Sequence, residues 1–253
     1  MFDWIEYLFT FCPRYVRRMG YLYELIGINR RGQRERVAWA QHLEMVKKSI
    51  MESSAKVSKY DRVVVLGSGL LFDIPVMELS QTFKEVVLVD VWHLRSVKKS
   101  VKKHGLLNVR FITADISGVA LVCFRWKKGR KLPDPMESLP DLPKADLVIS
   151  ANMISQLDLS PMKYIDCYDE EWGKKIVLAH IELMKNVAPV GCLIAEKWQM
   201  KVDHDGVPFE KMDMLWGVEL KDSKKSWIWN LASYGYHGDD FGTQSEIHYC
   251  CWA

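Results

Sequence analysis

Five short runs of apolar, mostly β-branched residues constrain the fold of this chain more than any other feature. They lie at residues 62–66, 86–90, 108–113, 146–150 and 191–196. Strands that lack a polar face are buried on both sides, and helical segments between successive strands make them run parallel. The runs therefore predict a doubly wound, mostly parallel sheet of the Rossmann-like α/β class.

The end of the chain departs from this alternation. Two further strand-like runs, 226–232 and 246–252, have no helix between them. They are expected to pair antiparallel, which completes a seven-stranded sheet with an antiparallel last strand. The first crossover helix is expected to begin at Asp73 as its N-cap. A long helical region is expected over 161–187, and a surface insertion over 116–145.

The first part of the chain is expected to be helical. Residues 3–26 and 33–52 have helical periodicity, with an interruption at Pro13 and a glycine- and arginine-rich link between the two stretches. The chain is thus predicted to divide into an N-terminal helical cap, 1–59, and an α/β ligand-binding domain, 60–253.

Composition excludes several classes of protein. The 253 residues are 49% hydrophobic and 26% charged, as in a globular protein, and the net charge of +3 is too small to favour a nucleic-acid partner. The six cysteines are scattered, without zinc-ligand spacing, which predicts a reducing compartment and no metal. No run reaches the roughly 18 apolar residues of a membrane span. We expect a cytoplasmic protein without an integral membrane segment; the sequence leaves its oligomeric state open.

A glycine-containing turn follows the first strand, where Val65-Leu66 is succeeded by Gly67-Ser68-Gly69. Glycine adopts positive φ without cost and allows a ligand to approach the backbone closely. The carboxyl ends of parallel strands form the ligand crevice of such a sheet. The turn is therefore a candidate binding element, although a tight turn with a purely structural role would have the same sequence.

Two carboxylates follow the next strands. Asp90 ends the second strand and can accept both hydroxyl hydrogens of a ribose. Asp115 follows the third strand and can accept from an exocyclic amine such as that of adenine, while Ile116 packs on the ring. Either side chain can instead cap the following helix. Together they indicate a ligand that contains a nucleoside.

Two nucleoside cofactors suit this arrangement. A nicotinamide dinucleotide site requires a third glycine, so that the helix can approach the pyrophosphate. Here that position is Phe72. S-adenosylmethionine has no phosphate, so the requirement does not apply to it.

On these residues the chain resembles the class I S-adenosylmethionine-dependent methyltransferases, and its element order is similar to uncharacterised bacterial methyltransferase-like members. The resemblance covers roughly residues 60–253, including the closing pair, in which the last strand is inserted between the fifth and sixth. It implies S-adenosylmethionine as cofactor and methyl transfer to a small-molecule acceptor. The cofactor-binding residues that it implies are Gly67, Ser68, Gly69, Asp90, Val91, Asp115, Ile116, Ala151 and Asn152.

The chain departs from the family pattern at two positions. The family's usual acid is replaced by Val65, and its usual third glycine by Leu71. Asp73, or an acid from the helical cap, is a candidate substitute for the missing carboxylate. The alternative function is a non-catalytic methyltransferase-like module that binds a nucleoside ligand or a protein partner, and a nicotinamide oxidoreductase ranks third.

The sequence assigns no catalytic residue, because methyl transfer from a sulfonium needs alignment more than acid–base chemistry. The methyl acceptor and the attacked atom are therefore not identified. Asn152 and Gln156 are candidates for substrate or cofactor contacts, or for a structural network. Glu196 is a candidate base or a partner of Lys197. The acidic segment 203–205 is expected to be a turn.

The helical cap is the expected specificity element. Its aromatic side chains and arginines could form a cage for an anionic or aromatic small molecule. Two other interpretations are an amphipathic lid with a solvated basic face, and docking of the aromatic-rich residues 2–11 on a membrane surface.

Overall fold

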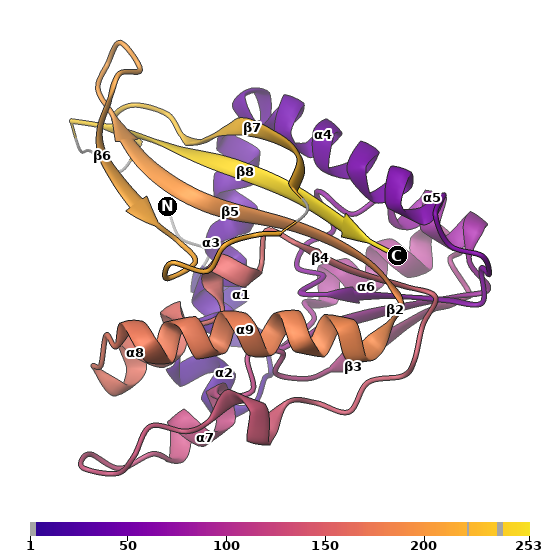
Figure 1. Cartoon of the computed structure of the whole chain (residues 1–253), viewed down its shortest axis with the longest axis horizontal. Helices are drawn as coiled ribbons and strands as arrows, with labels where there is room; N and C mark the ends of the chain where they lie inside the picture. The colour runs from indigo at the N-terminus through magenta and orange to yellow at the C-terminus, as the bar shows by residue number, and fades with distance from the viewer. Residues whose placement is uncertain (1–3, 222, 237–239) are drawn as a thin grey trace.

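The computed structural model describes residues 4–221, 223–236 and 240–253, without the side chains of Trp4 and Glu6. Its centre is one mixed sheet with the strand order β3-β2-β1-β4-β5-β8-β7 (Figure 1). The strands are β1 (Arg62–Leu66), β2 (Glu85–Asp90), β3 (Val109–Thr113), β4 (Leu147–Ala151), β5 (Val190–Val202), β6 (Pro208–Asp213), β7 (Ser223–Ala232) and β8 (Gly242–Trp252).

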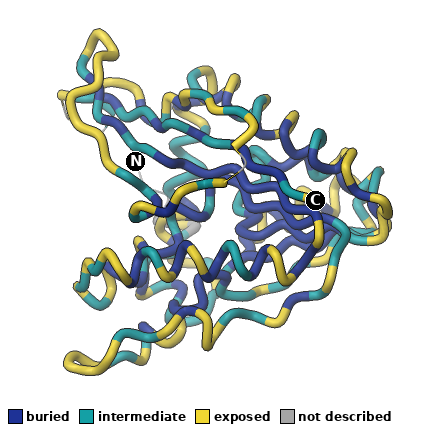
Figure 2. Tube along the Cα trace, viewed as in Figure 1, coloured by how far each residue is buried: buried dark blue, intermediate teal, exposed yellow. Residues whose placement is uncertain are grey.

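The strand directions confirm the predicted fold class. Strands β1 to β5 pair parallel, whereas β8 runs antiparallel between β5 and β7. The inner strands are buried along almost their whole length, which explains why their sequences lack alternation (Figure 2). This order places the carboxyl ends of β1, β2 and β4 side by side.

The predicted number of strands is corrected. The described residues form eight strands, because β6 pairs antiparallel with the extended end of β5. Strand β6 is largely exposed, with polar and apolar residues mixed. It lacks the apolar run that predicts the other strands, and its position depends on pairing with the long strand β5.

Helices cover both faces of the sheet. On one face α4 (Arg36–Ser54) packs through Trp39, Val46 and Ile50 against the strand core. On the other face α9 (Glu170–Val187) packs through residues such as Ile176 and Met184 (Figure 1). Because α4 shares the core of the sheet, the helical segment is partly built into the α/β layer. The division at residue 59 stays a prediction.

The N-terminal helices differ in their boundaries from the expectation. The interruption at Pro13 is confirmed, with α1 (Trp4–Phe9) before it and α2 (Arg14–Arg18) after it. The break between the two expected stretches lies at Glu35, a few residues beyond the glycines, because α3 (Tyr21–Arg34) continues through Gly27 and Gly32 and α4 begins at Arg36. A further break lies at Gly20, between α2 and α3, where a φ of +90° lies outside the helical region.

The remaining helices are α5 (Val76–Thr82), α6 (Arg95–Lys103), α7 (Ala120–Arg125) and α8 (Leu159–Ile165), with short 3₁₀ turns at Pro135–Ser138 and Ile154–Gln156. The expected long helix over 161–187 is divided at Asp166, which adopts a positive φ of 53°. The segment 116–145 is more than a surface insertion, since Val119, Ala120 and Cys123 enter the core. Among the described residues, no helix is long and apolar enough to cross a membrane.

Candidate functional site

Two adjoining cavities lie at one edge of the sheet. The larger of the two has a volume of about 730 Å³ and lies at the carboxyl ends of β1, β2 and β3. Residues of α2 and α3 in the helical cap also line it, so the cap lies at the site. Six of the nine residues implied by the family resemblance line this cavity: Gly67, Gly69, Val91, Asp90, Asp115 and Ile116.

The glycine turn has the backbone conformation expected from its sequence. Gly67 and Gly69 have φ values of 70° and 50°, and the amide of Gly67 donates to the carbonyl of Val89 over 2.8 Å. A Cβ atom on Gly69 would meet no atom closer than 3.9 Å, whereas one on Gly67 would lie 2.1 Å from Cγ of Met153. Space for a ligand is thus open beside Gly69, while Met153 covers Gly67.

Asp90 connects this turn to the second strand. Its Oδ2 accepts a hydrogen bond from the Gly69 amide over 2.7 Å, and its exposed fraction is 5%. Burial raises the pKa of Asp90 to about 6, although hydrogen bonds from the backbone amides of Gly69, Trp92 and Val91 oppose the shift. No cation pairs with it among the described residues. Its remaining lone pairs are available to ligand donors.

Asp115 stabilises the turn that leads into α7, although the N-cap position of α7 is Val119 and not Asp115. Its Oδ1 accepts from the amide and the hydroxyl of Ser117, and its Oδ2 accepts from the amide of Ala120 over 2.7 Å. These three bonds leave about one of the four acceptor positions of a carboxylate. Tyr21 from α3 lines the same cavity, and burial, reinforced by Asp115, raises its pKa well above the usual value.

A smaller cavity of about 320 Å³ adjoins the first, and the two share Gly67, Gly69, Met153 and Gln156 as lining residues. The other three implied residues, Ser68, Ala151 and Asn152, line this second cavity. All nine implied residues therefore lie along one edge of the sheet. Their assignment to a cofactor stays a prediction.

Asn152 joins a buried polar network instead of standing free in the cavity. It adopts a positive φ of 55°, which asparagine tolerates. Its amide nitrogen donates to Oδ2 of Asp73 over 2.8 Å and lies 3.1 Å from Nε2 of His42. Burial lowers the pKa of His42 to about 3, so the imidazole is neutral. Gln156 donates to the backbone carbonyl of Asn152.

The expected N-cap role of Asp73 is wrong. Helix α5 begins only at Val76, after Pro75, and no side chain caps it. The Asp73 carboxylate is occupied by Asn152, which lies beyond the fourth strand. Burial raises the pKa of Asp73. Asp73 does line the second cavity, as does Glu24 of the cap, so both candidate substitutes for the missing family acid are at the site.

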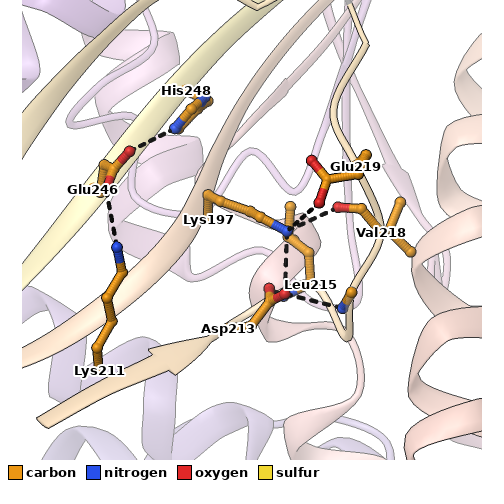
Figure 3. Close-up of polar contacts among 9 residues, drawn as sticks. Lys197, Lys211, Asp213, Leu215, Val218, Glu219, Glu246 and His248 are labelled. Atoms are coloured by element: carbon orange, nitrogen blue, oxygen red, sulfur yellow. Dashed lines mark hydrogen bonds and ion pairs between the residues drawn. The ribbon is translucent and has the colours of Figure 1, made fainter.

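Glu196 and Lys197 do not pair with each other. Glu196 lines the second cavity and accepts hydrogen bonds from Ser155, Gln199 and Ser245. Lys197 is directed to Asp213 at 3.1 Å and to the carbonyl of Val218 at 3.1 Å, as Figure 3 shows.

A bulge between β5 and β8 at Glu196–Trp198 separates the two environments. Figure 3 also shows the contacts that tie β6 to the rest of this region. The Asp213 carboxylate accepts from the amide of Leu215, and Glu246 bridges Lys211 and His248. Lys197 holds the segment after β6, from Asp213 to Val218, against the middle of β5.

The two departures from the family pattern have separate structural consequences. Val65 is fully buried in the strand core, where a carboxylate would have to be buried too. Leu71 occupies the position of the usual third glycine and still adopts a positive φ of 61°. Retaining that conformation with a side chain costs about 1–2 kcal/mol, and Leu71 packs against both apolar clusters nearby.

The structure also brings to the site residues that the sequence did not indicate. Met153 lies over the glycine turn, and Trp229 of β7 stacks on His42 with ring centroids 4.0 Å apart. The sequence could have indicated Trp229 through its spacing of two residues from Trp227, because this spacing places both side chains on one face of a strand. Trp227 donates to Nδ1 of His42 over 3.1 Å.

Several cap arginines have internal partners. Arg17 donates to the carbonyls of Tyr7 and Thr10, and Arg34 lies 4.5 Å from the ring centroid of Tyr236. Arg18 and Arg31 line the larger and the smaller cavity, respectively. Arg18 and Arg31 are therefore the two arginines that stay candidates for the predicted cage. The membrane-docking interpretation includes residues 2 and 3, which lie outside the described residues.

The acidic segment 203–205 forms the expected turn, between β5 and β6. Asp203 accepts from the amides of Asp205 and Val207, and His204 and Asp205 are exposed. Asp203, His204 and Asp205 are the only group of three or more metal-ligand side chains close together in the described part of the chain. Their hydrogen bonds account for the turn.

No protein-family model and no curated protein matches this sequence. Among solved structures, the chain is similar to N-methyltransferase NodS from Bradyrhizobium japonicum WM9 in complex with S-adenosyl-L-homocysteine, at 12% identity, 81% and 85% coverage of the two chains, and a TM-score of 0.40. It is similar to the N-terminal domain of EvdMO1 with the same ligand bound (10% identity, 81% and 79% coverage, TM-score 0.42). It is also similar to an rRNA methylase from Streptococcus thermophilus (12% identity, 82% and 96% coverage, TM-score 0.40).

The strand order decides the fold. It is the doubly wound, mostly parallel Rossmann-like order predicted from the sequence, with β8 antiparallel between β5 and β7. Within this fold the glycine turn, Asp90 and Asp115 stand at the ends of the first three strands, at the edge where ligands of doubly wound sheets bind. The predicted absence of a nucleic-acid partner stays a prediction, and so does the cytoplasmic location.

Proposed function

We propose that this protein binds S-adenosylmethionine in the larger cavity and transfers its methyl group to a small-molecule acceptor. Asp90 would hold the ribose, and Asp115 with Ile116 the adenine. The turn at Gly67 and Gly69 would lie along the methionine part of the cofactor. Ser68, Val91, Ala151 and Asn152 complete the residues assigned to it.

One observation carries this proposal. Asp90 is a buried carboxylate at the wall of a cavity of about 730 Å³, with no cation partner among the described residues. Ionising it without a ligand is unfavourable, as its raised pKa indicates. Ribose hydroxyls supply two neutral donors that favour the carboxylate form. The cavity volume is also within the range of small-molecule sites.

The packing around Phe72 supports an adenosyl ligand over a dinucleotide. The Phe72 ring fills the space beside Gly32 of α3, where a Cβ atom would lie 2.7 Å from it. Helix α5 begins only at Val76, so its amino end is removed from the turn. A pyrophosphate requires that helix end close to the turn. A sulfonium cofactor has no such requirement.

When bound, S-adenosylmethionine supplies a methyl group that its sulfonium sulfur already activates. The residues of this chain then have to align the acceptor and exclude water. The helical cap would exclude water, because Tyr21 and Leu25 of α3 line the cavity opposite the strand ends. The two adjoining cavities give the cofactor and the acceptor neighbouring positions.

The test is a calorimetric titration with S-adenosylmethionine, S-adenosylhomocysteine and NAD in parallel. We expect both adenosyl ligands to bind and NAD not to bind. Asp90→Asn should weaken adenosyl binding by at least about tenfold, because charged hydrogen bonds contribute about 1.5–3 kcal/mol each. The exposed Asp141→Asn is the matched control. Binding of NAD, or unchanged adenosyl affinity in Asp90→Asn, would refute the proposal.

A non-catalytic module that binds a nucleoside is the second candidate. The Met153 side chain favours it, because it occupies the space over Gly67 through which the methionine part would pass. Methionine is flexible enough to move aside. A Met153→Ala variant separates the two functions: a large gain in affinity for S-adenosylhomocysteine, with no gain for adenosine, would indicate that Met153 blocks the cofactor in the native protein.

A further inference from the structure

The smaller cavity gathers buried polar atoms that have no hydrogen-bond partner among the described residues. They are Nε of Arg31, Oγ of Ser68, Oδ1 of Asn152 and Nε1 of Trp229, all from lining residues. Ser68, Asn152 and Trp229 are each more than nine-tenths buried. Leaving a buried polar atom without a hydrogen-bond partner is unfavourable. All four atoms belong to residues that line this one cavity.

The charge of this lining selects the ligand. The carboxylates are Glu24, Asp73 and Glu196, against the single guanidinium of Arg31. Glu196 has an exposed fraction of 4%, and its three partners are neutral donors. No lysine, arginine or histidine forms an ion pair with it in the part of the chain that the structure describes. A buried carboxylate without a counter-ion favours a cationic ligand.

The apolar part of the lining favours an organic cation. Trp39 and Trp229 meet edge to face with centroids 5.1 Å apart, and Phe72 lines the same cavity. Aromatic faces attract ammonium groups but give no ligands to a metal ion. The carboxylates of this lining also do not converge as metal ligands do; the only described group that does is the exposed turn at 203–205.

We propose that the smaller cavity binds a small organic amine in its ammonium form, with Glu196 as its counter-ion. The volume of about 320 Å³ restricts the ligand to a small molecule. The bulge at Glu196–Trp198 sets Glu196 at the cavity wall while Lys197 is held by Asp213.

The further role of this amine rests on the proposed methyl transfer. The amine would be the acceptor, since its cavity shares Gly67, Gly69 and Met153 with the cofactor cavity. The ammonium passes one proton to Glu196, and the nitrogen lone pair then forms the bond to the methyl carbon. The electron pair of the broken carbon–sulfur bond stays on sulfur. The products are a methylated ammonium, a protonated Glu196 and a neutral thioether, so atoms and charge are conserved.

Benzylamine and its uncharged analogue benzyl alcohol are the probes, each titrated into the full chain with and without S-adenosylhomocysteine. We expect benzylamine to bind at least about tenfold more tightly than benzyl alcohol, and Glu196→Gln to remove that difference. The control is Glu210→Gln, an exposed acid on β6 paired with Lys201. Leu43→Phe narrows the cavity without changing a polar group, so it should prevent both probes from binding. This variant is the test of the cavity if Glu196→Gln does not fold.

The outcomes separate this inference from the proposed function. If S-adenosylhomocysteine binds but benzylamine binds no better than benzyl alcohol, the amine site is refuted and the cofactor site stands. If Glu196→Gln weakens S-adenosylhomocysteine as much as benzylamine, the cavity holds the ammonium of the cofactor itself, and a separate amine site is refuted. If only benzylamine binds, in the apoprotein, the amine site stands and the proposed cofactor is wrong.

Discussion

Asp90 should destabilise the ligand-free protein at neutral pH. Its pKa is about 6 in the folded chain, against an ordinary value of 3.8, because burial penalises the charged form. Below pH 3.8 the carboxyl group is protonated in both the folded and the unfolded state and costs nothing. Between pH 3.8 and 6 the unfolded state releases its proton while the folded state keeps it, so stability falls, and above pH 6 the folded state carries the full cost of the buried charge.

The size of this cost follows from the two pKa values. One pKa unit corresponds to 1.36 kcal/mol, so the penalty at neutral pH is about 3 kcal/mol. Asn resembles the protonated acid in shape, and its carbonyl can still accept from the Gly69 amide. Asp90→Asn should therefore stabilise the ligand-free protein by up to about 3 kcal/mol, which for a chain of this size raises Tm by up to about 10 °C.

The assay is urea unfolding of the wild type and Asp90→Asn at several pH values between about 4 and 8. The difference in free energy of unfolding should be near zero at the acid end, grow through pH 6 and then level off. The buried His42 and His180, whose pKa values burial lowers, are present in both proteins, so their titration cancels. A variant less stable than the wild type at neutral pH, or a difference independent of pH, would refute the reasoning.

Two further pairs of variants test the local geometry, with unfolding free energy as the readout. Gly67→Ala should lower the free energy of unfolding by about 2 kcal/mol or more, since its Cβ would meet Met153 and its φ is positive. Gly69→Ala, whose Cβ would point into open space, should lower it by about 1 kcal/mol. Equal losses of stability would contradict the difference in space around the two glycines. Lys197→Met should cost about 3 kcal/mol by leaving Asp213 without its buried partner, and the exposed Lys201→Met less than about 1 kcal/mol. A Lys197 effect as small as that of Lys201 would show that the buried pair does not hold this region.

The central sheet was predictable because its signals are local. Each inner strand is buried on both faces, so its apolar run appears directly in the sequence. The positive φ values of Gly67 and Gly69 follow from residues that adopt them without strain. The placement of Asp90 and Asp115 at one cavity follows from strand ends that meet at one edge.

The cap boundaries were less predictable because glycine is a weak breaker inside a well-packed helix. Gly32 remains helical in α3, where Phe72 and Trp39 pack against it. Gly20 ends a helix instead, through a positive φ that nothing in its neighbourhood opposes. The tertiary contact, and not the residue type, decides between the two outcomes.

The sequence alone determined the alternation of strands and helices, the parallel sheet and the row of glycines and acids along its edge, since all of these depend on residues close together in the chain. Tertiary structure alone decided that Asp73 binds Asn152, which is 79 residues away, instead of capping its own helix. It likewise decided that Glu196 faces a second cavity, with aromatic walls from α4 and β7. The physical reason is that a buried polar side chain must find a hydrogen-bond partner, and the nearest partner in space belongs to a distant part of the sequence.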